Sequence, residues 1–82
     1  MNEEIEYVKK SQYRLRVFKC LEGEVKMPSV IARETNIVQN HMSKVLNQLM
    51  EHDLIECINP EAKKGRIYRM TEKGEELVKY LD

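Results

Sequence analysis

The hydrophobic residues near the start of the chain recur with the spacing of one helix face. Five of them fall on that face: Tyr13, Val17, Phe18, Cys20 and Leu21. The pattern predicts a helix over about residues 3–21, ended by Glu22 and Gly23, because glycine tolerates the left-handed conformation that closes a helix. A polar run at residues 9–12 leaves open whether this stretch is one helix or two.

Two more helices are predicted next, and a sharp turn separates them. Pro28 suits the first position of a short helix over residues 28–35, because its fixed φ matches helical backbone. Asn36 stands where the chain must turn, and asparagine is the non-glycine residue that best tolerates the left-handed conformation. The following helix is predicted over residues 38–52.

The helix over residues 38–52 separates its apolar residues from its polar ones. At about 100° per residue, five hydrophobic side chains share one arc: Val38, Met42, Val45, Leu46 and Leu49. The opposite side is polar and contains one lysine: Gln39, Asn40, His41, Ser43, Lys44, Asn47, Gln48 and Glu51. This polar face is either a recognition surface or an ordinary solvated one.

The period changes after this helix and predicts a β-hairpin. Two runs rich in β-branched and aromatic residues, 55–59 and 66–71, flank a basic tip in which Gly65 supplies a strained turn position. Thr71 is an N-cap residue, and acidic side chains follow it at the start of a last helix over residues 72–81.

This order of elements resembles the winged helix-turn-helix domain of the MarR and ArsR types of prokaryotic transcriptional regulator. The segment YRLRVFKCLEGE is similar to the first helix of that domain, and PSVIARETNIVQNHMSKVLNQLMEHDLIE to its helix-turn-helix and the start of its wing. The segment GRIYRMTEKGEELVKYL is similar to the returning strand and the final helix. Two positions depart from the family pattern. Asn36 replaces the usual turn glycine, and Val38 replaces the Ser or Thr that caps the recognition helix and contacts phosphate.

The expected fold class is therefore mostly α with a small β-hairpin (α+β). We expect one domain, 1–82, in these parts: an N-terminal helical extension at 1–12, the helix-turn-helix at 28–52, the wing at 55–71 and the C-terminal helix at 72–81.

Length and composition suggest that the domain needs a partner copy. The chain has 82 residues, 41% hydrophobic and 34% charged, and a domain of this size buries only about 60–65% of its unfolded surface. The extension contains Ile5, Tyr7 and Val8, which we expect to leave apolar surface for a second copy. A homodimer would present two recognition helices about 34 Å apart to adjacent major grooves.

The charge balance argues neither for nor strongly against nucleic acid as the partner. Lysine and arginine total 14, as do aspartate and glutamate, so the formal net charge is zero. The charges are nevertheless segregated along the chain, and a neutral protein can present basic patches over the ~10 Å of a Debye length. The basic run from Lys9 to Lys19 either borders a duplex or only balances the acidic segments.

The side chains suited to DNA recognition fall into two groups. Those that donate and accept hydrogen bonds near the start of the third helix are the candidates for reading bases: Gln39, Asn40, His41, Ser43 and Asn47. The candidates for phosphate or minor-groove contact are Lys44, Lys63, Lys64 and Arg66, together with Ser29 and Lys26. Since this helix has no arginine, and Gln and Asn pair best with adenine, an A·T-leaning site is expected.

Other chemistry finds little support in the sequence. Cys20 and Cys57 form no CxxC pair, and each is expected to be a small buried hydrophobe, with a redox role left open. His41 and His52 lie about 16 Å apart along one helix, too far to share a metal ion. No enzyme motif is present, so neither catalysis, a metal nor a cofactor is expected. The acidic start and the lack of a long apolar run indicate a cytoplasmic protein.

Three functions are compatible with these observations. The first is a homodimeric regulator of transcription that binds double-stranded DNA, with any small-molecule effector unknown. The second is a winged helix used for protein–protein contact in a transcription-related complex, which the neutral charge and the single lysine on the third helix favour. The third is a non-specific architectural protein, which the lack of a dominant basic surface disfavours.

Overall fold

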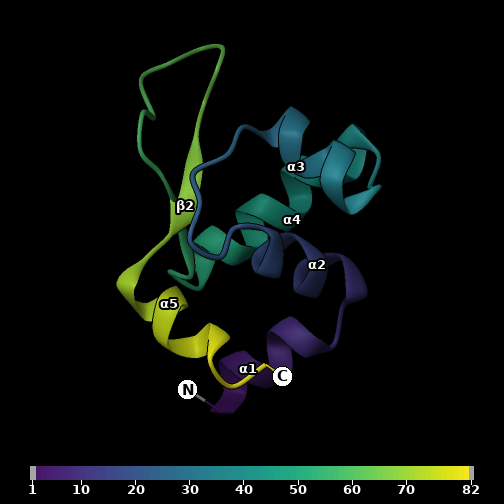
Figure 1. Ribbon diagram of the computed structural model, residues 1–82, viewed down its shortest axis with the longest axis vertical. Coiled ribbons are helices and arrows are strands. Elements are labelled where there is room, and N and C mark those ends of the chain that lie inside the picture. The colour runs from purple at the N-terminus through teal and green to yellow at the C-terminus, as the bar shows by residue number, and fades with distance from the viewer. Residues whose placement is uncertain (1, 82) are drawn as a thin grey trace.

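The computed structural model describes residues 2–81. Five helices and one hairpin follow one another in these residues: α1 (Asn2–Lys9), α2 (Gln12–Cys20), α3 (Pro28–Thr35), α4 (Gln39–Glu51), β1 (Ile55–Cys57), β2 (Tyr68–Met70) and α5 (Glu72–Val78). The tip of the hairpin projects away from the helices, and α1 and α5 lie at the opposite end of the molecule (Figure 1). The predicted fold class and the order of its elements are confirmed.

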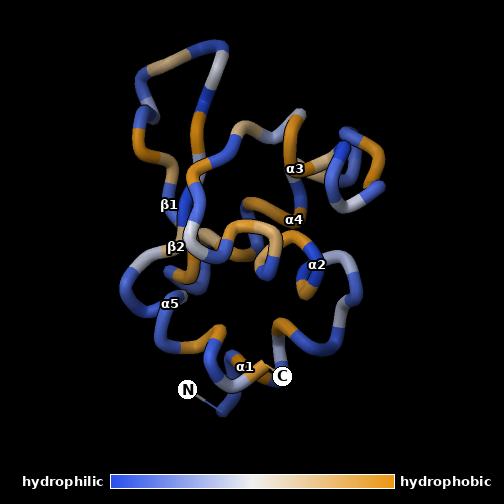
Figure 2. Tube along the Cα trace, viewed as in Figure 1, coloured by the Kyte–Doolittle hydropathy of each residue, from blue (hydrophilic) through white to orange (hydrophobic). Residues whose placement is uncertain are grey.

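The core lies between the helices and the base of the hairpin. Phe18, Leu49 and Leu77 are completely buried there. Figure 2 shows hydrophobic residues on α2 and α4 where these helices meet, whereas the hairpin tip is mostly hydrophilic. The predicted apolar face of α4 packs into this core, with one exception: Val38 is 59% exposed. Val38 precedes the first helical turn as the extended N-cap residue, so the helical angle that predicted its burial does not apply to it.

The first predicted helix is in fact two helices. Ser11 adopts an extended conformation between α1 and α2, and its Oγ accepts a hydrogen bond from the Arg14 N–H at 3.2 Å. Gly23 has the expected positive φ of 72°. It lies in the turn two residues after the C-cap Leu21, however, and not directly after the cap as predicted.

The N-terminal extension packs against the rest of its own chain. Val8 is completely buried, and Ile5 packs against the core. Tyr7 stacks on His52 with the ring centroids 4.0 Å apart. The expectation of apolar surface for a partner is therefore wrong for Val8, whereas Ile5 and Tyr7 are only half-buried, so it stays a prediction for these two.

The turn between α3 and α4 follows the prediction. Pro28 is the first residue of α3, and Asn36 takes the left-handed conformation with φ 59° and ψ 37° while its N–H donates to the Ala32 carbonyl. The start of α4 has no side-chain cap, as the valine at position 38 predicted.

The strands are shorter than predicted because pairing is confined to the base of the hairpin. Glu56 pairs with Arg69 in the antiparallel register. An isolated antiparallel bridge joins Tyr68, the first residue of β2, to Lys26 in the loop before α3. This third backbone segment fixes the hairpin against the helix-turn-helix.

The last helix begins at the predicted cap and ends earlier than predicted, at Val78. Thr71 Oγ1 accepts a hydrogen bond from the Gly74 N–H at 3.0 Å. Gly74 is buried against the carbonyl oxygen of Leu54, which a Cβ at this position would overlap. Close packing of α5 on the start of β1 therefore requires glycine. Leu81 lies beyond the helix but remains buried.

Candidate nucleic-acid interface

The side chains predicted to read bases are exposed along α4. All five lie outside the core: Gln39, Asn40, His41, Ser43 and Asn47. At about 100° per residue, three of these, Asn40, Ser43 and Asn47, fall within an arc of roughly 60°. We call these three residues the α4 ridge. They are directed opposite to the buried face of the helix, so they can form hydrogen bonds with an external partner.

A groove runs between the α4 ridge and the hairpin. It has a volume of about 390 Å³ and is lined by residues of α3, α4 and the hairpin. Four of the predicted site residues line it: Ser29, Ser43, Lys63 and Arg66. We call it the wing groove. The structure therefore brings together candidates that lie up to 37 positions apart in the sequence (from 29 to 66).

The hairpin tip is held in one shape by its own side chains. Asn59 Nδ2 donates to the Gly65 carbonyl at 3.0 Å, and Asn59 Oδ1 accepts from the Ile67 N–H at 2.8 Å. Arg66 Nε donates to the Ala62 carbonyl at 2.8 Å and Nη2 to the Pro60 carbonyl at 3.1 Å. Arg66 thus has a structural role in the tip, which the sequence analysis did not predict.

Asn59 was also missed by the sequence analysis. The signal that could have identified it is the Asn59-Pro60 pair, because Asn before Pro favours turn initiation.

Three lysines are available to an external anion. Lys44, Lys63 and Lys64 are exposed, and none of them has a hydrogen bond or an ion pair with the residues that the structure describes. Because Asn59 and Arg66 already hold the tip in place, Lys63 and Lys64 can meet a phosphate without first ordering the loop, which lowers the entropic cost of binding.

His41 and Lys44 lie on the α2 side of α4, away from the wing groove. They line a shallow hollow together with Tyr13, and the His41 ring meets the Tyr13 ring edge-on at 5.7 Å. Arg14, from the basic run, binds the Tyr7 carbonyl at 2.9 Å and Gln48 Oε1 at 3.2 Å. Arg14 therefore ties α1 to α4 through α2.

Lys26 is separate from the other candidates for phosphate contact. Its ammonium donates to Glu34 Oε1 at 2.6 Å and to the Cys20 carbonyl at 2.7 Å, and its side chain is only 11% exposed. The hydrogen bond to Glu34 raises the pKa of Lys26, and the same contact lowers the pKa of Glu34. The prediction of a phosphate contact by Lys26 gains no support, because a carboxylate already occupies this ammonium.

The two cysteines are half-buried and pack against the core, whereas the sequence analysis expected both to be buried. Burial raises the pKa of the Cys20 thiol, and a hydrogen bond to Glu34 is the second cause of this increase. The thiol is therefore more fully protonated, and less nucleophilic, than an ordinary cysteine.

Two kinds of feature are absent from the residues that the structure describes. Within residues 2–81, no group of three or more His, Cys, Asp or Glu side chains is placed to hold a metal ion. In the same residues, no helix has both the length and the apolar character needed to cross a membrane.

Comparison with known proteins identifies the architecture. The winged helix-turn-helix family model matches residues 6–82. A mutant of ZitR from Lactococcus lactis superposes with a TM-score of 0.75 at 20% sequence identity, over 84% of this chain and 48% of that one. The MarR family transcriptional regulator SPO1453 from Silicibacter pomeroyi DSS-3 gives a TM-score of 0.75 at 19% identity, over 98% of this chain and 60% of that one.

The chain spans roughly half of the length of the two solved structures that it resembles. No curated protein matches the sequence. The likeness to the solved structures therefore defines the fold, whereas any DNA interface depends on the side chains of this chain.

Proposed function

The chain belongs to the winged helix-turn-helix family, and we propose that it binds double-stranded DNA as a homodimer and regulates transcription. In this proposal α4 enters the major groove, where the α4 ridge reads base edges. The hairpin then acts as the wing, and Lys63 and Lys64 contact phosphates or the adjacent minor groove.

The observation that supports this proposal most strongly is the wing groove with its flanking cations. Ser29, Ser43, Lys63 and Arg66 come from three separate elements yet line one groove. A major groove about 12 Å wide admits one helix, and phosphates flank it on both sides. Lys44 on the far side of the α4 ridge and the lysines of the tip would then meet phosphates on opposite sides of the inserted helix.

The composition of the α4 ridge favours adenine. Asn40 and Asn47 can each pair with N6 and N7 of an adenine, whereas the commonest guanine contact needs arginine, which α4 lacks. Gln39 at the start of the helix has the same preference. We therefore expect an A·T-leaning site, read with modest specificity.

A homodimer is proposed through the end of the molecule formed by α1 and α5. This end lies opposite the hairpin tip (Figure 1), so a two-fold axis there would leave both copies of α4 exposed. Tyr80, just after α5, is 59% exposed and offers an apolar surface there, whereas Val8 of α1 is completely buried in its own chain. SPO1453 is itself named a transcriptional regulator.

A second candidate is a winged helix used for protein–protein contact. The observation that favours it is the zero net charge of the chain, together with a single lysine on α4. Because a protein partner offers no row of phosphates, its binding would not weaken with salt as steeply as DNA binding does.

The test is fluorescence anisotropy on an A·T-rich and a mixed-sequence duplex at about 50 and 200 mM salt. Three cations per protomer (Lys44, Lys63 and Lys64) give six phosphate contacts per dimer, so affinity should fall about a thousandfold between these salt concentrations. The Lys63→Glu/Lys64→Glu variant should bind far more weakly and show a shallower dependence on salt. Arg66 is kept, because it shapes the tip.

The matched control is Lys9→Glu/Lys79→Glu, which makes the same charge change at the α1 and α5 end of the molecule. Because this end is also the proposed dimer surface, sedimentation first establishes that the control is still a dimer. A dimeric control should bind DNA nearly as the unmodified protein does, with the small difference expected from net charge. If the unmodified protein stays unbound at 50 mM salt while sedimentation shows a folded dimer, DNA binding is refuted and the second candidate takes its place. A folded monomer that binds DNA would refute only the dimer.

A further inference from the structure

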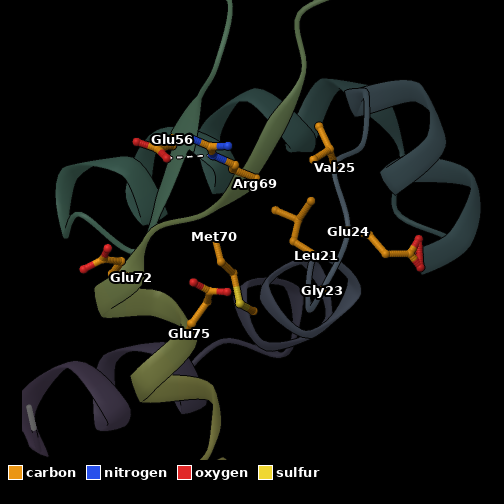
Figure 3. A pocket seen from close by; sticks show the side chains of 9 residues that line it. All are labelled: Leu21, Gly23, Glu24, Val25, Glu56, Arg69, Met70, Glu72 and Glu75. Carbon is orange, nitrogen blue, oxygen red and sulfur yellow. Dashed lines mark hydrogen bonds and ion pairs between the residues drawn. The ribbon is translucent and has the colours of Figure 1, made fainter.

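A second hollow lies on the outer side of the hairpin base and differs in kind from the wing groove. It has a volume of about 540 Å³ and is formed by the loop after α2, the two strands and the start of α5. Figure 3 shows Met70 near its centre and Leu21 and Val25 beside it. Leu21 and Met70 form a buried apolar floor, whereas Val25 is 49% exposed. We call this hollow the acidic groove, after its rim.

The rim carries an excess of negative charge. Four glutamates and one arginine line the acidic groove, and the arginine, Arg69, is bound to Glu56 at 2.8 Å. Glu72 and Glu75 have no ion pair with any residue that the structure describes, and they lie on the α5 side of the groove (Figure 3). A nucleic-acid phosphate would be repelled here, whereas a cation would be attracted.

The two grooves therefore divide a chain of zero net charge into faces of opposite sign. The wing groove is lined by Lys63 and Arg66 and by no acidic side chain, whereas four glutamates line the acidic groove. Residues of the hairpin tip line the first groove, whereas residues of the hairpin base line the second (Figure 3). A ligand at one groove thus leaves the other accessible.

We infer that the acidic groove docks a segment of another protein in which an aliphatic or aromatic side chain stands between lysine or arginine residues. The apolar side chain would cover Val25, which is 49% exposed, and so remove this apolar surface from water. The flanking cations would approach Glu72 and Glu75, where complementary charge sets partner choice and speeds association. This inference does not depend on DNA binding, since it uses no residue of the proposed DNA interface.

The probe is a fluorescein-labelled pentapeptide with a central leucine between two Lys-Arg pairs. Two comparison peptides replace the leucine by serine or the four cations by glutamates. Anisotropy measures binding, and methyl NMR spectra locate it. We expect binding of the first peptide alone, with shifts in the methyl signals of Met70, Leu21 and Val25.

Two variants test the groove without endangering the fold. Glu72→Gln/Glu75→Gln should weaken peptide binding at least about tenfold, because charge complementarity is lost. The control Glu3→Gln/Glu6→Gln makes the same charge change on α1 and should bind the peptide as before. Val25→Ser, in an exposed loop, should also weaken binding by removing the apolar wall. Those of the three that sedimentation shows to be dimeric like the unmodified protein should keep its DNA affinity within a few-fold, so the two proposals fail separately.

Three outcomes would overturn the inference. The first is the absence of methyl shifts in the groove at millimolar peptide. The second is equal binding of the leucine and serine peptides, which would indicate charge attraction without docking. The third is self-association of the unmodified protein that Val25→Ser abolishes, which would make a second copy of this chain the occupant.

Discussion

The helices α4 and α5 begin in opposite ways. At the start of α4, the N-cap is Val38, no side chain accepts from the backbone, and the first turn contains no acidic residue. At the start of α5, Thr71 accepts from the Gly74 N–H, and Glu72 and Glu75 lie in the first turn. Both helix ends carry the partial positive charge of unpaired N–H groups.

This difference separates a helix start that serves folding from one left available for a ligand. The cap and carboxylates of α5 satisfy its own N–H groups, and they would repel a phosphate. The start of α4 keeps N–H groups without a side-chain partner beside the proposed DNA interface, where an external phosphate can bind them. The lost cap weakens α4 locally, but its buried face holds it against α2 and α3.

The largest expected effect tests the close packing at α5. The change Gly74→Ala places a Cβ against the carbonyl oxygen of Leu54, which is backbone and cannot yield easily. We expect a loss of about 3 kcal/mol or more in the free energy of unfolding, measured by urea titration followed by circular dichroism. The control is Gly65→Ala, where φ is +70° and nothing lies within 4 Å, so only backbone strain of about 1–2 kcal/mol is added. Equal losses at the two positions would contradict this account of α5.

The next effect concerns the α4 ridge. Replacing Asn40 or Asn47 by alanine removes an adenine contact worth about 1–3 kcal/mol of discrimination. The ratio of affinities for A·T-rich and mixed duplexes should therefore fall roughly five- to a hundredfold, with little change in the unfolding midpoint, because both side chains are exposed. Glu51→Ala, at the far end of α4, should leave the ratio unchanged. An unchanged ratio in both asparagine variants would remove the α4 ridge from base reading.

A smaller effect tests the two helix starts directly. Thr71→Ala should lower stability by about 1–2 kcal/mol, because it removes both the cap and the hydrogen bond from Thr71 Oγ1 to the Asp53 carbonyl at 2.6 Å. Val38→Ser should do the reverse and raise stability by up to about 1 kcal/mol, since it adds the missing cap. Thermal melts of both variants measure these two changes in stability. Destabilisation by Val38→Ser would show that the exposed valine has a contact that this comparison overlooks.

The smallest effect concerns the Lys26–Glu34 ion pair beside α3. Because the hydrogen bond from Lys26 lowers the pKa of Glu34, the unfolded chain takes up the proton first as pH falls. The stabilisation is present above the ordinary glutamate pKa of 4.5 and is lost as pH falls through the lowered value. The melting temperature of Glu34→Gln should therefore be lower than that of the unmodified protein at pH 7 and equal to it at strongly acidic pH. The control Glu22→Gln, in an exposed turn, keeps the Lys26–Glu34 ion pair, so its melting temperature should match that of the unmodified protein at both pH values.

Much of the fold could be predicted because it depends on local backbone geometry. The apolar stripe of α4 follows from a period of 3.6 residues. The start of α3 at Pro28, the left-handed turn at Asn36 and the cap at Thr71 each depend on one residue and its immediate neighbours. The match of the family model to residues 6–82 is consistent with this, since such local sequence features determine the order of the elements.

The partner that each side chain finds after folding could not be predicted from the sequence. Lys26 looked free for a phosphate, but folding places Glu34 beside it. Val8 looked available to a partner copy, but α1 folds back and buries it completely. Arg66 looked like a simple phosphate ligand, but the tip directs it onto its own carbonyls. Periodicity indicates which face of an element is apolar, whereas the partner of each side chain depends on how the loops fold and how the elements pack together.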